Sequence, residues 1–433
     1  VEGTFTMPLG VCALKAWLTK YGFESEVLGL NIKLYIASEE KYLWDDDHLP
    51  WWNNDKSFNE TVLKNIVLQE WIDKIVNSDA EFIGFSVSYQ SVLISLYLVK
   101  KIKQRTDKKI IFGGPECHQS NVERFFNNGV DAVVVGEGEQ SLLELLQNFK
   151  VFPGVYLNEN GKIVYGGDRD LMDINKLPIP DFDDIIEDYR KLSQDIWLSV
   201  SLLRGCINRC AYCDECVMWK KARQRSSVDF VNELMVLKKK YNISGFCKVD
   251  STLAVSAATI NEVCDLLIEN KLDLLWYSQA RPEKWMNIDL LKKLRKAGCI
   301  CMGYGVETGS QKMLDRMRKN LDIEAIKDVL KNSVEAEIRI IVNIMVDSPQ
   351  ETWMDYLRTV VFVIKWLKKP IDFNVNTAGI PFRSDWHNNP SKYNIVIESN
   401  GYNWHTKFYK NNYIFAKVKK HLLDIIKSKR NKN

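Results

Sequence analysis

The sequence predicts an α/β protein built from two parts, a doubly wound parallel sheet and, after it, a partial (β/α)6 barrel. In both parts, apolar, β-branched runs alternate with amphipathic helical segments, as is typical of parallel sheets covered by helices. Residues 150–195 interrupt this pattern with many Pro, Gly and acidic residues. The length of 433 residues suits two or three domains of roughly 100–200 residues. We therefore expect a Rossmann-like domain at 1–149, a linker at 150–195, a barrel at 196–381 and a C-terminal extension at 382–433.

In the first part, the predicted strands are apolar enough to be buried on both faces. Helices are expected at 13–21, 60–77, 91–105, 122–127 and 141–149. Strands are expected at 24–30, 82–87, 109–112 and 132–135. Residues 38–57, rich in Trp, Asp and Asn, indicate an insertion loop, and 155–165 indicate a hairpin inside the linker. Strands that alternate with helices pair in parallel and bind ligands at their C-terminal ends.

In the second part, the same alternation continues with longer units. Strands are expected at 196–203, 245–249, 275–279, 300–306, 338–346 and 373–378. Helices are expected at 228–241, 259–270, 288–297, 323–336 and 351–367. This repeat predicts a shortened relative of the eight-stranded α/β barrel, which carries its functional side chains at the C-terminal ends of the strands.

Composition and charge exclude several classes of protein. The net charge is only +3, from 59 basic and 56 acidic residues, which gives no electrostatic reason to expect nucleic acid as a partner. No apolar run approaches the ~20 residues of a membrane span, and the N-terminus does not look like a signal peptide. Ten cysteines in a chain this large favour reduced thiols with a metal or catalytic role over a disulfide scaffold. We therefore expect a cytoplasmic protein.

Three of the cysteines are closely spaced. Cys206, Cys210 and Cys213 follow the predicted strand 196–203 directly, in the segment RGCINRCAYC. Three thiolates on a short loop suit iron–sulfur or zinc. Structural zinc commonly takes four ligands in two pairs, and no matching second pair is present. A cluster held by three cysteines keeps one iron open to an outside ligand. Cys216 is an idle thiol, a substrate-side residue or a substitute ligand.

The spacing Cys-x-x-x-Cys-x-Tyr-Cys, with Tyr212 before the third cysteine, resembles the radical S-adenosylmethionine (SAM) superfamily. The resemblance implies that Cys206, Cys210 and Cys213 hold a 4Fe-4S cluster whose open iron binds SAM. It also implies that an electron from an external donor cleaves SAM to a 5′-deoxyadenosyl radical.

Three further segments resemble barrel motifs of this family: GFCKVDSTL, GYGVETGSQKML and IMVDSPQET. By resemblance, SAM would be contacted by Tyr212, Asp250, Arg281, Glu307, Thr308 and Ser310. Ser251 stands where the family usually has a second acid. Asp347 and Gln350 stand where it has glycines.

The first part resembles the cobalamin-binding domain that often precedes this barrel. The segments that carry the likeness are MPLG, FIGFSV, IIFGGPE, VVVGEGE and KLPIPDFD. The implied cobalamin contacts are Leu9, Gly10, Ser86, Gly113, Gly114, Pro115, Gly136, Glu137 and Gly138. Since the sequence opens at Val1, in the loop before the first helix, we expect this domain to lack the leading strand that is usual in the family. The D-x-H-x-x-G motif is also absent, and His118 is only a partial echo of it, so we expect cobalamin to bind without a protein histidine.

These observations predict a cobalamin-dependent radical SAM enzyme. The expected reaction is methyl transfer to an unactivated carbon or phosphorus centre of a small molecule or peptide. Two alternatives stay open: a radical SAM cyclase or oxidoreductase that does not use cobalamin, and a non-catalytic iron–sulfur or zinc protein. No motif identifies the substrate, and no residue is predicted as a catalytic acid or base.

Overall fold

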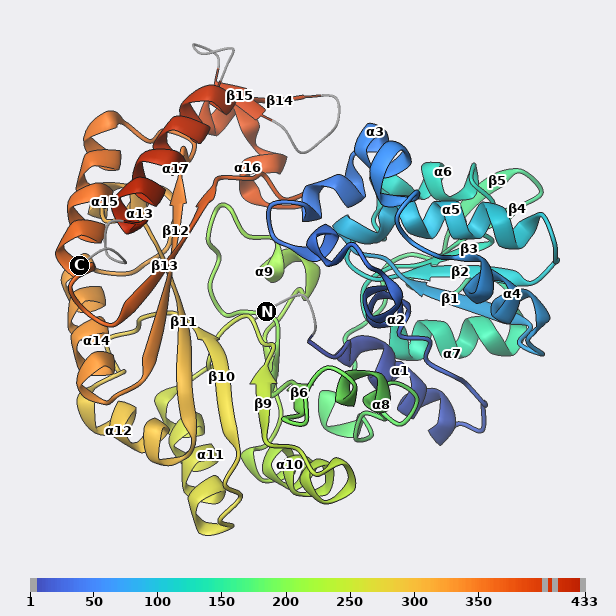
Figure 1. Ribbon diagram of the computed structural model, residues 1–433, viewed down its shortest axis with the longest axis horizontal. Coiled ribbons are helices and arrows are strands. Elements are labelled where there is room, and N and C mark those ends of the chain that lie inside the picture. Colours follow the sequence, from blue (N-terminus) through green and yellow to red (C-terminus); the bar gives the residue numbers. More distant parts are fainter. Residues whose placement is uncertain (1–5, 399–403, 407–411, 429–433) are drawn as a thin grey trace. The chain divides into compact units, whose positions relative to one another are not determined.

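The computed structural model describes residues 6–398, 404–406 and 412–428 (Figure 1). The chain divides into two compact units between Ile196 and Trp197. Both units are α/β, and each is built on a sheet whose main strands are parallel. The predicted fold class is confirmed.

The first unit contains a five-stranded sheet in the order β1-β2-β3-β4-β5. Its strands are β1 (Phe82–Ser86), β2 (Lys109–Gly113), β3 (Ala132–Val134), β4 (Val155–Glu159) and β5 (Lys162–Tyr165). The first three are parallel, and the predicted hairpin, β4–β5, adds two antiparallel strands beside β3. The helices are α1 (Leu9–Lys20), α2 (Leu30–Ala37), α3 (Asp55–Ser57), α4 (Gln69–Asn77), α5 (Val92–Lys103), α6 (Gln119–Phe126), α7 (Gly138–Asn148) and α8 (Ile186–Arg190).

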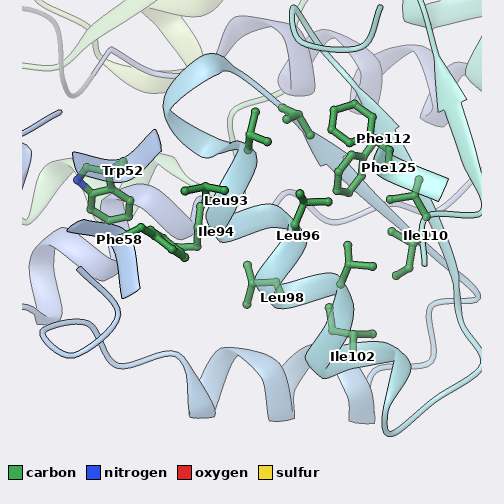
Figure 2. Packing of buried hydrophobic residues seen from close by; sticks show 14 of the residues in the cluster. Trp52, Phe58, Leu93, Ile94, Leu96, Leu98, Ile102, Ile110, Phe112 and Phe125 are labelled. Atoms are coloured by element: carbon green, nitrogen blue, oxygen red, sulfur yellow. The ribbon is translucent and has the colours of Figure 1, made fainter. Parts of the chain in front are cut away.

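A hydrophobic core joins helix α5 to the sheet. Figure 2 shows Leu96 and Ile102 of α5 on the side that faces Ile110 and Phe112 of β2. Phe112 also packs edge-on against Phe125 of α6, with ring centroids 5.1 Å apart. These side chains are almost completely buried. The alternating pattern is therefore explained by burial of one helix face against an apolar strand.

Three segments of this unit differ from the prediction. Residues 24–30 form no strand within the described part of the chain; the N–H of Val27 instead donates to Asp184 Oδ2 at 2.7 Å. Residues 38–57 form short helical turns, η1 (Lys41–Trp44) and η2 (Leu49–Asn53), because Trp44 and Trp52 are buried in the core. The helix expected at 60–77 is broken between η3 (Phe58–Val62) and α4.

The second unit contains a six-stranded parallel sheet in the order β13-β12-β11-β10-β9-β6. Its strands are β6 (Trp197–Val200), β9 (Gly245–Lys248), β10 (Leu275–Ala280), β11 (Cys299–Glu307), β12 (Arg339–Val346) and β13 (Ile371–Thr377). Figure 1 shows this sheet curved, with helices along its outer face, as expected for a partial barrel. Because neighbouring strands are parallel, their C-terminal ends share one edge.

Helices connect these strands. They are α9 (Glu215–Met218), α10 (Ser227–Tyr241), α11 (Ala257–Glu269), α12 (Ile288–Lys296), α13 (Gln311–Arg316), α14 (Ile323–Glu335), α15 (Trp353–Trp366), α16 (Asp385–Asn388) and α17 (Asn412–Ser428). Six of them begin at a side-chain cap: Ser226, Ser256, Asn287, Asp322, Thr352 and Ser384. These caps fix where each strand-end loop gives way to a helix.

Two short two-stranded sheets complete the unit: β7 (Leu203–Arg204) with β8 (Arg223–Gln224), and β14 (Ile395–Ile397) with β15 (Trp404–Thr406). The strand expected at 196–203 is split into β6 and β7. The break lies at Ser201 and Leu202, whose side chain and backbone N–H respectively donate to Asp250. Across the ranges that the structure describes, no helix is both long and apolar enough to cross a bilayer.

Candidate functional site

The three clustered cysteines lie on an irregular loop that follows β7. At its start, Gly205 has φ +83°, and a Cβ there would lie 2.8 Å from Cβ of Trp219, so the turn requires glycine. Further on, the N–H of Ala211 donates to the carbonyl of Met317 at 2.8 Å, and the carbonyl of Ala211 accepts from Trp386 at 3.0 Å. The loop is therefore held by the end of α13 and by α16.

The cysteine thiols have the chemistry that an iron–sulfur cluster requires. All three are free of disulfides. Cys206 Sγ accepts from the backbone N–H of Asn208 at 3.4 Å, and Cys210 Sγ accepts from Arg281 Nη1 at 3.4 Å. Hydrogen bonds of this kind to cysteine sulfur are typical of iron–sulfur sites. Soft sulfur donors on one short loop therefore fit a 4Fe-4S cluster.

Burial affects the protonation of Cys213. Burial raises the pKa of Cys213 to about 12, against the backbone N–H of Glu215, which lowers it. Cluster binding must therefore displace a proton from Cys213. No three His, Cys, Asp or Glu side chains in the described ranges are close enough to hold a single metal ion; a four-iron cluster is wider than one ion. Cys216 lies on α9, and burial raises its pKa as well.

A buried polar network lies directly beside the cysteine loop. The hydroxyl of Tyr212 donates to Glu307 Oε1 at 3.2 Å and accepts from Lys319 Nζ at 2.6 Å. Lys319 Nζ also pairs with Glu307 Oε1 at 2.7 Å, and only 4% of the Lys319 side chain is exposed. Burial, and after it the charge of Glu307, raise the pKa of Tyr212, so its phenol stays protonated. Tyr212 and Glu307, two of the predicted SAM contacts, thus lie together.

The backbone around this network is built to bring Glu307 to it. Glu307 ends β11 with φ +69°, next to an irregularity in the pairing of β11 with β12. A Cβ on Gly305 would lie 2.8 Å from Glu307 Oε1 and 3.1 Å from Lys319 Nζ, so a larger residue there would require the ends of both side chains to shift. A non-glycine residue at positive φ is strained, and such strain concentrates at functional positions.

Lys319 is a residue of the site that the sequence did not predict. It follows α13, between Arg318 and Asn320, which both have positive φ (52° and 53°). This tight turn directs Lys319 Nζ to Tyr212 and Glu307. In sequence, Lys319 stands among other basic residues, in RMRKN, and no pattern there marks it as buried.

Arg281, also predicted to contact SAM, lies against Cys210 of the cysteine loop. Besides Cys210, it donates from Nε to Glu283 Oε1 at 2.9 Å and from Nη2 to the carbonyl of Lys319. Its side chain is 7% exposed. Arg281 and the Tyr212–Glu307 pair therefore both contact Lys319.

The remaining predicted SAM contacts make bonds within the protein. Asp250 is fully buried and forms an ion pair with Lys248. Thr308 Oγ1 lies 2.9 Å from Thr359 Oγ1, and Ser310 Oγ donates to Asp355 Oδ1 at 2.7 Å. These hydroxyls tie β11 to α15. The second acid expected beside Asp250 is replaced by Ser251, whose hydroxyl bonds to Glu215 on the cysteine side.

The turn after β12 lacks the glycines of the family pattern, but its backbone still adopts positive φ angles at the two substituted positions. Asp347 and Gln350 have φ +58° and +66°, values that glycine adopts more readily. The negative charge of Asp347 is paired with Lys419 of α17. Lys419 Nζ lies 3.0 Å from Asp347 Oδ1 and 2.7 Å from Glu351 Oε2. An ion pair from the C-terminal helix thus stabilises this turn.

In the first unit, the predicted cobalamin contacts gather at one edge of the sheet. Ser86, Gly113 and Pro115 lie at or just after the C-terminal ends of β1 and β2. Of the others, Gly114 directly follows β2, Gly136 and Glu137 follow β3, and Leu9, Gly10 and Gly138 lie at the start of a helix. A Cβ on Gly10, Gly113 or Gly136 would meet nothing within 4 Å, so a flat ligand could approach the backbone there.

Two contacts at this edge shape the loops themselves. Gly114 has φ +107°, and a Cβ there would lie 2.7 Å from the carbonyl oxygen of Val87. A Cβ on Gly138 would lie 3.3 Å from Leu14, so this glycine lets α7 approach α1. His118 is 5% exposed and bonds to Ser120 and Asn121, as expected for a structural residue.

Comparison with protein families identifies both domains. Residues 200–363 match the Radical SAM superfamily, and residues 55–146 match the B12 binding domain. Both resemblances predicted from the sequence are confirmed. An uncharacterised methyltransferase of Pyrococcus horikoshii is 24% identical over 72% of this chain and 69% of its own length.

Two solved structures share the fold. The cobalamin-dependent SAM radical enzyme OxsB, with aqua-cobalamin bound, has a TM-score of 0.75 at 14% identity; the match covers 96% of this chain and 64% of that one. The radical SAM methyltransferase TsrM of Kitasatospora setae, with cobalamin and a [4Fe-4S] cluster bound, has a TM-score of 0.67 at 18% identity. That match covers 88% of this chain and 74% of TsrM.

Proposed function

The chain is a radical SAM enzyme that carries a B12-binding domain before its barrel, and on this premise we propose that it is a cobalamin-dependent methyltransferase. Its substrate would be a small molecule or peptide, methylated at an unactivated carbon or phosphorus centre. The observation that carries the proposal is the presence of both sites in one chain: the cysteine loop with its Tyr212–Glu307–Lys319 network, and the glycine-lined sheet edge of the first unit. The methyltransferase names of TsrM and of the Pyrococcus relative support it.

In this proposal, Cys206, Cys210 and Cys213 hold the 4Fe-4S cluster, and the first unit holds cobalamin at the ends of β1–β3. When bound, the cluster supplies an electron to SAM and cobalamin carries the methyl group.

The residues of the barrel would bind and orient SAM. Glu307 is a carboxylate held in place by a phenol and an ammonium, so it can accept hydrogen bonds from a hydroxyl or ammonium group without rearranging. Tyr212 keeps its proton and fixes one oxygen of Glu307. Because Lys319 is nearly fully buried, water has little access to that side of the carboxylate. Asp250, Thr308 and Ser310 would act by shaping the surrounding loops.

The direct test is anaerobic purification followed by measurement of iron, sulfide and cobalamin. We expect about four iron atoms per chain, as a 4Fe-4S cluster requires. Replacing Cys206, Cys210 and Cys213 together by Ala should remove the iron and leave cobalamin bound, because the two sites are in separate units. Iron content unchanged by this triple replacement would contradict the proposal.

Two further arms distinguish the alternatives. With SAM labelled in its methyl group and a chemical reductant, the wild-type protein should form 5′-deoxyadenosine and label bound cobalamin. Formation of 5′-deoxyadenosine without any bound cobalamin would favour a radical SAM cyclase or oxidoreductase instead. Cys216→Ala decides the role of that thiol: retained iron identifies an idle cysteine, and lost iron a cluster ligand.

A further inference from the structure

Arg281 is fixed on all three of its nitrogens. Nε donates to Glu283 Oε1 at 2.9 Å, Nη1 to Cys210 Sγ at 3.4 Å and Nη2 to the carbonyl oxygen of Lys319. Both Arg281 and Cys210 are 7% exposed. A planar guanidinium held at three points has one orientation, and in it one N–H is directed at the sulfur of a cluster ligand.

We propose that Arg281 is a positioning residue for the iron–sulfur cluster, which it makes easier to reduce through its bond to Cys210, and that it is not primarily a SAM contact. This inference rests on the proposed function, because it requires a cluster at Cys206, Cys210 and Cys213. It assigns Arg281 a role different from the one that the family resemblance implied.

The physical reason is the change of charge on reduction. One-electron reduction adds a negative charge, which spreads over the cluster and its cysteine sulfurs. An N–H donor and a positive charge at a ligating sulfur stabilise the reduced form more than the oxidised form, and so raise the reduction potential. The effect is large where water is excluded, as it is around Arg281 and Cys210.

The nearby carboxylate of Glu283 opposes this effect only in part. The Glu283 side chain is 28% exposed, whereas that of Arg281 is 7% exposed, so water screens the negative charge better than the positive one. Glu283 therefore serves mainly to orient the guanidinium. The carbonyl of Lys319 orients it from the other side, while Lys319 Nζ holds Tyr212 and Glu307. Arg281 thus contacts the cluster ligand Cys210, whereas Lys319 Nζ contacts Tyr212 and Glu307, which are expected to contact SAM.

The test is a redox titration of the anaerobically purified, full-length protein without SAM. The electron paramagnetic resonance (EPR) signal of the reduced cluster measures how much of the cluster is reduced at each potential. In Arg281→Met, the ratio of oxidised to reduced cluster at a fixed potential should rise about tenfold, which for one electron corresponds to a shift of 59 mV to a more negative potential. Arg281→Lys keeps the positive charge but loses the planar guanidinium with its several N–H donors, and should shift the potential less than Arg281→Met does. The dissociation constant of SAM should change less than about threefold in both variants.

Glu283→Gln supplies a control of opposite sign. It removes a negative charge and leaves Arg281 on Cys210 and Lys319, so the potential should move to a less negative value. This variant decides the question if Arg281→Met does not retain its cluster. An unchanged potential in Arg281→Met or in Glu283→Gln, or SAM binding weakened more than tenfold in Arg281→Met at an unchanged potential, would overturn the inference. A wild-type protein without a cluster would instead refute the proposed function.

Discussion

At the end of β9, the carboxylate of Asp250 is completely buried, whereas at the end of β11 that of Glu307 is 14% exposed. Asp250 accepts from Ser201 Oγ at 2.7 Å and from the N–H of Leu202 at 3.0 Å, and pairs with the buried Lys248. Its hydrogen-bonding capacity is used to join the end of β9 to the break between β6 and β7, just before the cysteine loop. The carboxylate of Asp250 is therefore bonded entirely within the protein, whereas that of Glu307 is partly exposed.

Glu307 has partners of another kind. Tyr212 comes from the cysteine loop and Lys319 from the turn after α13, and the backbone of Glu307 itself lies at positive φ. Asp250 adopts no such conformation. A place at the C-terminal end of a barrel strand is thus not enough to make a carboxylate a ligand contact; its partners and its backbone decide. We expect Asp250 to govern stability and Glu307 to govern SAM binding.

The largest expected effect is on the Asp250 side. Lys248→Met leaves a buried carboxylate without its cation and should lower the free energy of unfolding by about 3–5 kcal/mol. Urea denaturation measures this loss. The double variant Lys248→Met/Asp250→Asn is the matched control and should recover part of it, because the unpaired charge is gone. A loss below about 1 kcal/mol in the single variant would remove the distinction between the two carboxylates.

On the other side, Glu307→Gln should leave iron content unchanged and weaken SAM binding roughly tenfold or more, and it should also lower stability, because it leaves the buried Lys319 without its carboxylate. The weaker binding is expected because a hydrogen bond to a charged group contributes about 1.5–3 kcal/mol, which neutral glutamine does not supply. Equilibrium dialysis with labelled SAM measures the change. Two variants of Lys319 test whether its ion pair with Glu307 contributes to SAM binding. Lys319→Met should bind SAM more weakly than the wild type, and Lys319→Arg, which keeps the positive charge, should bind SAM more tightly than Lys319→Met.

A third strand end, that of β12, carries Asp347, whose positive φ resembles that of Glu307 and whose pairing with a buried lysine resembles that of Asp250. Asp347→Ala keeps the strain and removes the ion pair, while Asp347→Gly also relieves the strain. We expect Asp347→Gly to be more stable than Asp347→Ala by about 1 kcal/mol, since glycine adopts positive φ without the cost of a Cβ. Equal stability of the two variants would show that the backbone of this turn relaxes freely.

The smallest effect concerns Asp355, which supports Ser310 from α15. Burial alone would raise the pKa of Asp355, but hydrogen bonds from Thr352 and Ser310 outweigh it and lower the pKa below its usual 3.8. A lowered folded-state pKa gives stability that is present above pH 3.8 and is lost as the pH falls through the folded-state value. The difference in unfolding free energy between wild type and Asp355→Asn should therefore shrink on acidification from pH 6 toward roughly pH 3. A difference that stays constant over this range would contradict the lowered pKa.

The sequence predicted the strands of the barrel and the cysteine loop because both depend on local patterns. Apolar runs such as 338–346 form strands wherever neighbours exist to pair with them, and β12 has one on each side. The segment 24–30, also expected to be a strand, is shorter and more polar and forms no strand in the described chain, where the N–H of Val27 donates to Asp184 instead.

The site was predictable only in part, for a similar reason. The resemblance to the radical SAM superfamily pointed to Tyr212, Arg281 and Glu307, and the structure places Tyr212 against Glu307 and Arg281 against Cys210. The resemblance could not tell that Asp250 is paired with Lys248, two residues away on the same strand end, or that Lys319 is buried, because a lysine that neutralises a carboxylate looks like any surface lysine in sequence. Lys419, which supports Asp347, lies 72 residues further along the chain.

The most direct test of the account is the response of the reduced cluster to SAM. We predict that SAM changes the EPR spectrum of the reduced wild-type protein, and that Glu307→Gln, with the same iron content, needs at least about ten times more SAM for the same change. A wild-type spectrum that does not respond to SAM, or a Glu307→Gln protein that responds at the same concentration as the wild type, would contradict the assignment of Glu307 to SAM binding beside the cluster.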